Sequence, residues 1–96
     1  MNYAYLHGFA ADSGSEKGQQ LADQFADWGI DLHLPDLNVP SFEELTYTGM
    51  VEAVDRMVAE VGGEEPWRFI GSSMGGFIAA RWGARHPERV DRLVLL

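Results

Sequence analysis

Cysteine is absent from the 96 residues, which excludes disulfide bridges, thiolate metal sites and a cysteine nucleophile. Basic residues are scarce: seven Lys and Arg stand against 15 Asp and Glu, and the formal net charge is −8. So little positive charge disfavours binding to nucleic acids and to anionic membranes. No apolar run approaches the roughly 18 residues of a membrane span, and Met1–Leu6 lacks the basic region of a signal peptide. We therefore expect a cytoplasmic protein.

The sequence does contain a regular alternation of short apolar runs and amphipathic stretches. The expected strands are Tyr3–Leu6, Ile30–Leu34, Trp67–Ile70 and Leu93–Leu96. The expected helices are one that follows Ser13–Glu16 and ends at Gly29, one that contains Met50–Val61, and one over Phe77–Arg85. Ser13–Glu16 and Ser41–Glu44 each have the spacing of a capping box. Alternating strands and helices predict an α/β fold, in which βαβ units form a parallel sheet with flanking helices.

A serine lies between an apolar strand and an apolar helix, within Gly71-Ser72-Ser73-Met74-Gly75, which matches G-x-S-x-G. A strand that turns into a helix within one residue forces the central serine toward positive φ and projects its hydroxyl from the sheet edge. Gly71 and Gly75 allow strand and helix to pack closely, and Gly76 gives further room. We therefore interpret Ser73 as a nucleophile, with the positive end of the helix behind it.

Other structures also fit this glycine-rich segment. An ordinary tight turn does, and so does an anion cradle, as in a flavodoxin-like domain. A phosphate-binding loop is disfavoured because the lysine of G-x-x-x-x-G-K-[ST] is missing, and the dinucleotide fingerprint is unmatched. No H-x-x-x-H pair or acidic ligand cluster occurs, so we expect neither a metal nor a cofactor.

His7-Gly8-Phe9 follows the first expected strand. In a parallel sheet this segment would lie beside Ser73 if the first and third strands are neighbours. The N–H of Phe9 would then join the N–H of Met74 as the two donors of an oxyanion hole. Gly8 would let the backbone approach the reacting carbonyl. The alternative is a strand-end turn with a surface histidine.

Together, Tyr5-Leu6-His7-Gly8-Phe9 and Gly71-Ser72-Ser73-Met74-Gly75-Gly76 resemble the α/β-hydrolase superfamily. Because the first motif comes so early, and because Ser15–Leu21 is similar to their first helix, the chain resembles the short YqiA-like esterases of that superfamily. His86–Val90 and Leu93–Leu96 are similar to the next helix and strand. The resemblance implies a three-layer α/β-hydrolase fold, with the strands in the order 2-1-3-4 as counted in this chain.

The resemblance also implies hydrolysis of an ester or related acyl bond of a small-molecule substrate, with Ser73 as nucleophile. In this superfamily the triad acid and histidine follow the serine along the chain. We expect both beyond Leu96, so that residues 1–96 are the N-terminal part of a single domain. The alternative is a truncated, inactive domain that serves as an interaction module. A bare sheet edge at Leu93–Leu96 would favour association.

None of the three histidines is expected to act as the base for Ser73. His86 follows at the far end of a helix, about 20 Å away at the helical rise. His33 lies on a strand two positions from the serine strand, roughly 10 Å off. His7 belongs to the oxyanion side of the serine. Asp36 is expected to organise the turn after the second strand rather than to carry catalysis.

Overall fold

The computed structural model describes residues 1–8, 14, 16–38 and 46–96. Its elements in chain order are β1 (Asn2–Leu6), α1 (Glu16–Asp27), β2 (Leu32–His33), α2 (Tyr47–Val61), β3 (Trp67–Gly71), α3 (Met74–Arg85), the 3₁₀ helix η2 (Pro87–Arg89) and β4 (Val90–Leu95). The strands form one parallel sheet in the order β2-β1-β3-β4. The predicted α/β fold and its strand order are confirmed.

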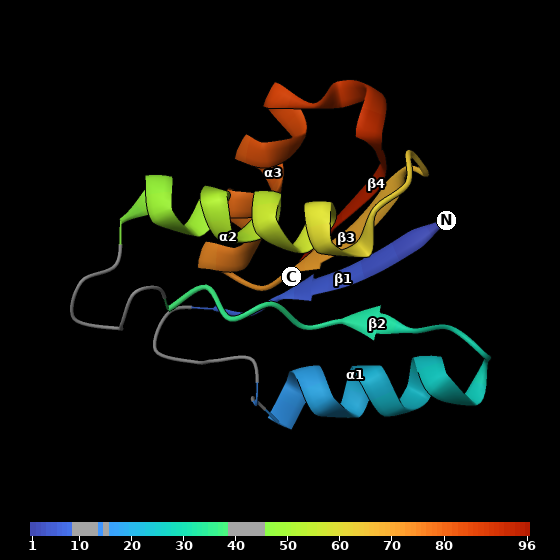
Figure 1. Ribbon diagram of the computed structural model, residues 1–96. Helices are drawn as coiled ribbons and strands as arrows, with labels where there is room; N and C mark the ends of the chain where they lie inside the picture. Colours follow the sequence, from blue (N-terminus) through green and yellow to red (C-terminus); the bar gives the residue numbers. More distant parts are fainter. Residues whose placement is uncertain (9–13, 15, 39–45) are drawn as a thin grey trace.

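Helices cover both faces of the sheet, as Figure 1 shows: α1 lies on one side, and α2 and α3 lie on the other. Because the strands are parallel, β1 and β3 end at the same edge of the sheet. Each helix that connects two of them must run back from that edge, so α2 and α3 begin there. None of the helices in the described part of the chain has the length and apolar character needed to cross a membrane.

The core lies between β3 and the two helices on one face of the sheet, α2 and α3. Trp67 and Phe69 alternate along β3 onto this face, and their rings stack with centroids 5.7 Å apart. Trp82 of α3 meets Phe69 edge to face at 5.4 Å. All three side chains are buried. Burial of each large apolar side chain contributes about 1.5–3 kcal/mol, so this aromatic group anchors α3 and its N-terminus on the sheet.

The helix α2 contains the expected apolar face from Met50 to Val61 and begins at Tyr47. Thr46 is its N-cap, and the Thr46 hydroxyl accepts a hydrogen bond from the Gly49 N–H at 2.9 Å. The capping box expected at Ser41–Glu44 lies outside the described residues, as does part of the one at Ser13–Glu16. The end of α2 is where the glycines predict it: Gly62 has φ 77, and its N–H donates to the Val58 carbonyl at 3.0 Å.

Three elements differ from expectation by more than one residue at a boundary. β2 is limited to Leu32–His33, because only these residues pair with β1. α3 begins at Met74 rather than Phe77, because the Ser73 carbonyl already accepts helical hydrogen bonds. β4 begins at Val90, which pairs with Trp67 at the start of β3.

β4 is the edge strand of the described sheet, and its apolar side chains are exposed. Val94 is 48% exposed and Leu95 is 60% exposed, whereas Phe69 on the neighbouring strand is fully buried. Burial on both faces is typical of strands in parallel sheets. The described residues thus leave an apolar strip uncovered along β4.

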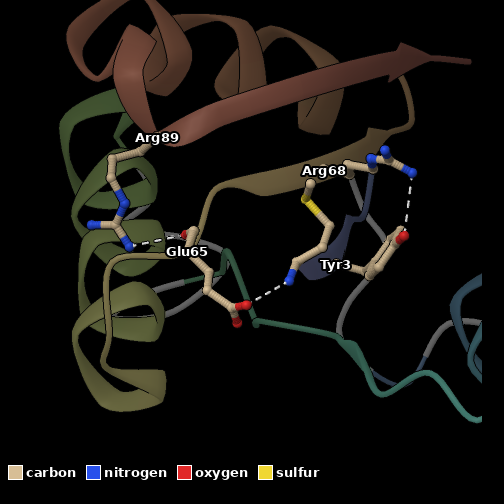
Figure 2. Close-up of polar contacts among 5 residues, drawn as sticks. Tyr3, Glu65, Arg68 and Arg89 are labelled. Carbon is tan, nitrogen blue, oxygen red and sulfur yellow. Dashed lines mark hydrogen bonds and ion pairs between the residues drawn. The ribbon is translucent and has the colours of Figure 1, made fainter.

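Polar contacts join the strands at their amino ends, opposite to the serine edge (Figure 2). The Met1 amino group pairs with the Glu65 carboxylate at 2.9 Å, and Arg68 donates to the Tyr3 hydroxyl at 3.2 Å. Arg89 donates to the Glu65 carbonyl at 3.4 Å. The Glu65 side chain is 66% exposed, so its ion pair contributes little stability in water. These contacts support the register of β1 on β3.

Candidate active site

Ser73 occupies the turn between β3 and α3 with φ 55 and ψ −114. It is the one non-glycine residue with positive φ in the part of the chain that the structure describes. The strained turn predicted from G-x-S-x-G is therefore present. Ser73 is exposed, and its hydroxyl makes no capping hydrogen bond to the helix that follows. The hydroxyl is free to meet a ligand.

The glycines around Ser73 are there for steric reasons. A Cβ added at Gly71 would lie 2.5 Å from the Gly76 nitrogen, and one at Gly75 would lie 2.6 Å from the His7 carbonyl oxygen. A Cβ at Gly76 would lie 3.2 Å from the Gly71 carbonyl oxygen. Contacts below 3.0 Å require a shift of the backbone, so Gly71 and Gly75 permit the packing of α3 against the ends of β1 and β3.

Backbone hydrogen bonds hold the turn in place. The Ser72 N–H donates to the Leu6 carbonyl of β1 at 3.1 Å, and the Ser73 N–H donates to the Leu96 carbonyl at 3.2 Å. The Ser73 carbonyl accepts from the Gly76 N–H at 3.0 Å, which starts α3. Both neighbouring strands therefore fix the nucleophile candidate, so that its position does not depend on its own side chain.

One predicted oxyanion donor, the Met74 N–H, lies next to Ser73 in the first turn of α3. Among the described residues it has no hydrogen-bond acceptor. The first turn of α3 contains no acidic side chain, so the positive end of the helix is not neutralised by the helix itself. The other predicted donor, Phe9, lies outside the described residues. Its neighbour Gly8 does approach the turn: a Cβ there would lie 3.6 Å from the Ser73 Cβ.

His7 is buried beside this turn, and both of its ring nitrogens are engaged. Its Nε2 lies 2.9 Å from the Leu37 nitrogen and accepts that N–H. The ring proton therefore resides on Nδ1, which lies 3.0 Å from the Gly8 carbonyl oxygen and donates to it. Such a histidine joins the end of β1 to the loop after β2, and it has no free nitrogen to take a proton from Ser73.

Asp36 also has the local role expected for it. Its Oδ1 accepts the Asn38 N–H at 2.9 Å, which is the hydrogen bond of an Asx turn. The same oxygen lies 3.6 Å from the His7 Nε2, but that nitrogen accepts the Leu37 N–H and carries no proton to share.

The two remaining histidines lie away from Ser73. His86 is the C-cap of α3, at the opposite end of the helix from Ser73. Its ring packs on Trp82 at 4.5 Å, and its Nε2 lies 3.7 Å from an oxygen of Asp55. His33 lies on β2, which is separated from the serine strand by β1. The contact of His7 with Leu37 is the site feature that sequence reasoning missed, because no local spacing connects the two residues.

A surface pocket of about 340 Å³ lies on the other side of β1, between the end of β2 and α2. Its lining includes His33, Pro35, Arg56 and Glu60, and it does not include Ser73. Its lining in the described part of the chain contains no serine, threonine or cysteine. We therefore place the candidate active site at the Ser73 turn rather than in this pocket.

The sheet order and the strand–serine–helix turn are those of the nucleophile-bearing part of an α/β-hydrolase. The chain belongs to the uncharacterised protein family UPF0227, whose model matches residues 2–95. This membership agrees with the resemblance to the YqiA-like members of the superfamily.

Solved structures show the same fold. An extracellular α/β-hydrolase from a Paenibacillus species superposes with a TM-score of 0.83 at 17% identity, over 99% of this chain and 39% of that protein. Polyneuridine aldehyde esterase superposes with a TM-score of 0.82 at 19% identity, over 98% of this chain and 38% of that protein. The fold is therefore that of the N-terminal portion of an α/β-hydrolase.

Two curated relatives match nearly the whole chain. Pimeloyl-[acyl-carrier protein] methyl ester esterase of Chromobacterium violaceum is 32% identical over 95% of this chain and 34% of its own length. Monoacylglycerol lipase abhd6-B of Xenopus laevis is 28% identical over 95% of this chain and 28% of its own length. The chain thus spans about a third of the length of the curated relatives that it matches.

Proposed function

We propose that this chain carries the nucleophile of a serine hydrolase that acts on an ester or related acyl bond. The observation that carries the proposal is Ser73, an exposed serine with positive φ whose hydroxyl makes no capping bond to α3, held between β3 and α3. A structural turn has no need to place a non-glycine residue in this conformation, which costs about 1–3 kcal/mol. Two of the matched relatives are named as an esterase and a lipase, and these names support the same reaction class.

In the proposed reaction the Ser73 oxygen attacks the acyl carbon while its proton passes to a histidine base. The carbonyl oxygen becomes an oxyanion, which the Met74 N–H and the Phe9 N–H would receive. The bond to the alcohol oxygen then breaks, and the alcohol leaves with the proton from the histidine. Water cleaves the resulting acyl-serine in the same way. Each oxyanion donor of this kind contributes about 10²–10³ in rate.

We further propose that the base, and the acid that orients it, come from a part of the protein beyond residues 1–96. None of the histidines reaches Ser73: His7 uses both nitrogens, and His33 and His86 lie elsewhere in the fold. In the superfamily, both groups follow the nucleophile. The relatives are about three times as long as the matched region, which leaves room for these groups.

The proposal is tested with the protein encoded by the complete reading frame. The wild type is expected to hydrolyse p-nitrophenyl acetate and to be labelled by a fluorophosphonate at Ser73, located by peptide mass spectrometry. Ser73→Ala should abolish both, whereas Ser72→Ala, its neighbour in the same turn, should retain them. Hydrolysis that persists in Ser73→Ala would show that another group is the nucleophile.

The second candidate is a catalytically inactive α/β domain that binds a partner, and the exposed apolar side chains of β4 favour it. The reading frame after Leu96 separates the two candidates. An Asp or Glu after one later strand and a His after the next supports the hydrolase. A stop codon directly after Leu96 supports the binding domain.

A further inference from the structure

Two exposed aromatic side chains lie close to the serine turn. Tyr47, the first residue of α2, is 57% exposed, and Phe77, in the first turn of α3, is 46% exposed. Their rings meet edge to face with centroids 5.2 Å apart. Single exposed apolar residues are ordinary on protein surfaces, but a contacting aromatic pair forms a continuous apolar surface.

The backbone of α3 places Phe77 one helical turn after Ser73. Its N–H donates to the Ser73 carbonyl at 3.2 Å, so the two residues lie one turn apart on the same face of α3. Side chains on a helix lean toward its N-terminus, and the Phe77 ring therefore leans toward Ser73. The neighbouring helix α2 begins at the same edge of the sheet (Figure 1), and its first residue, Tyr47, contacts the Phe77 ring.

The Phe77 ring also contacts a cation. The Arg81 guanidinium lies 5.7 Å from the ring centroid, one turn further along α3. A cation over the ring restrains the position of the ring. The ring is nevertheless 46% exposed, so apolar surface remains open on it.

We propose that Tyr47 and Phe77 form a binding surface for an apolar acyl chain of the ester that reacts at Ser73. This inference rests on the proposed function. During acyl transfer the acyl chain stays attached to the Ser73 oxygen, so a surface one helical turn away contacts it in both steps of the reaction. Longer alkyl chains gain from such a surface, whereas an acetyl group is too short to reach it.

The experiment compares p-nitrophenyl octanoate with p-nitrophenyl acetate, which differ only in the acyl chain, in the protein encoded by the complete reading frame. The readout is the ratio of their kcat/KM values. The wild type should prefer octanoate, and Phe77→Ala should lower the ratio about tenfold, the scale of one or two methylenes lost from an apolar contact. Phe77→Leu and Tyr47→Phe keep an apolar side chain, so they should lower it less.

Trp28→Ala is the matched control, because Trp28 is also exposed, at 62%, but follows α1 on the other side of the sheet. It should leave the ratio unchanged. Circular dichroism of each variant checks that it folds. An octanoate preference that is absent, or that survives in both Phe77→Ala and Tyr47→Ala, would overturn this inference while Ser73 is still labelled by the fluorophosphonate. Absence of that labelling would overturn the proposed function and the inference with it.

Discussion

Ser73 keeps its strained backbone conformation because hydrogen bonds to the neighbouring strands fix it. Hydrogen bonds from Ser72 and Ser73 to the carbonyls of Leu6 and Leu96 hold the residue from both sides. The strain, about 1–3 kcal/mol, is offset by the packing of α3 on the sheet, which requires glycine at positions where strand and helix touch.

Gly75→Ala tests this packing. A Cβ at Gly75 would lie 2.6 Å from the His7 carbonyl oxygen, and the added methyl group would push α3 away from β1. We expect the free energy of unfolding, measured by urea denaturation, to fall by about 3 kcal/mol, the upper end of the cost of overpacking. The control is Gly83→Ala on the same helix, where the nearest atom is a Val90 methyl group at 3.4 Å. Its effect should be neutral or stabilising, since alanine favours a helix by about 1 kcal/mol. Equal losses in the two variants would contradict the steric explanation.

His7 shows what a motif can and cannot predict about one residue. Its position after the first strand predicted that it would lie on the oxyanion side of Ser73, and Gly8 does approach the turn. Its acceptance of the Leu37 N–H at 2.9 Å could not be predicted, because the two residues are 30 positions apart. This contact depends on how the loop after β2 folds back over the end of β1.

At the scale of elements, α2 and α3 are joined by a hydrogen bond as well as by the core. The Trp82 indole N–H donates to the Asp55 Oδ1 at 2.7 Å, and the Trp82 ring is buried against Phe69. This bond fixes the helix that begins after Ser73 against the one that begins at Tyr47. The relative position of the two proposed acyl-binding rings therefore depends on it.

Asp55→Ala removes the acceptor and leaves the Trp82 N–H unpaired. A hydrogen bond to a charged group contributes about 1.5–3 kcal/mol, so we expect a loss of that size in the free energy of unfolding. Asp55→Asn keeps an oxygen acceptor and should cost less. Glu52→Ala, at an exposed position on the same helix, should change stability by less than about 0.5 kcal/mol. Urea denaturation of the three variants provides the comparison, and a loss in Asp55→Asn as large as in Asp55→Ala would contradict it.

The boundaries of elements show how far local patterns can be trusted. Gly29 and Gly62 have φ near 75 and lie after α1 and α2, as their sequence positions predict. The capping box expected at Ser41–Glu44 lies outside the described residues, and α2 itself begins after Thr46, which is a good N-cap residue. Thr46 is the N-cap because the buried face of the helix begins at Met50, one turn later.

At the scale of the whole molecule, the described residues cover the sheet with helices on both faces but leave an open strip along one edge. Leu95 and Leu96 are each about 60% exposed at the end of β4. An edge strand with exposed apolar side chains is a surface on which another strand can add.

We therefore expect the 96-residue chain by itself to self-associate through β4. Analytical ultracentrifugation should show a mass that rises with protein concentration. A double variant, Val94→Lys with Leu96→Lys, should remain monomeric over the same range, because like charges brought together at the edge oppose pairing. Val61→Lys, which changes an exposed apolar side chain at the end of α2, should associate like the wild type. A wild-type chain that stays monomeric would contradict the prediction.

The sequence by itself determined the alternation of elements and the strained serine, and its resemblance to the α/β-hydrolases supplied the strand order. The first two features follow from local chemistry: apolar periodicity, the conformational freedom of glycine and the steric demands of a strand that turns into a helix. Only the tertiary structure decided which side chains from different elements meet around the serine turn. The His7–Leu37 hydrogen bond, the Trp82–Asp55 hydrogen bond and the contact of Tyr47 with Phe77 each join residues that are far apart in the sequence. Such contacts depend on how the helices pack against the sheet, and no pattern within one segment specifies that packing.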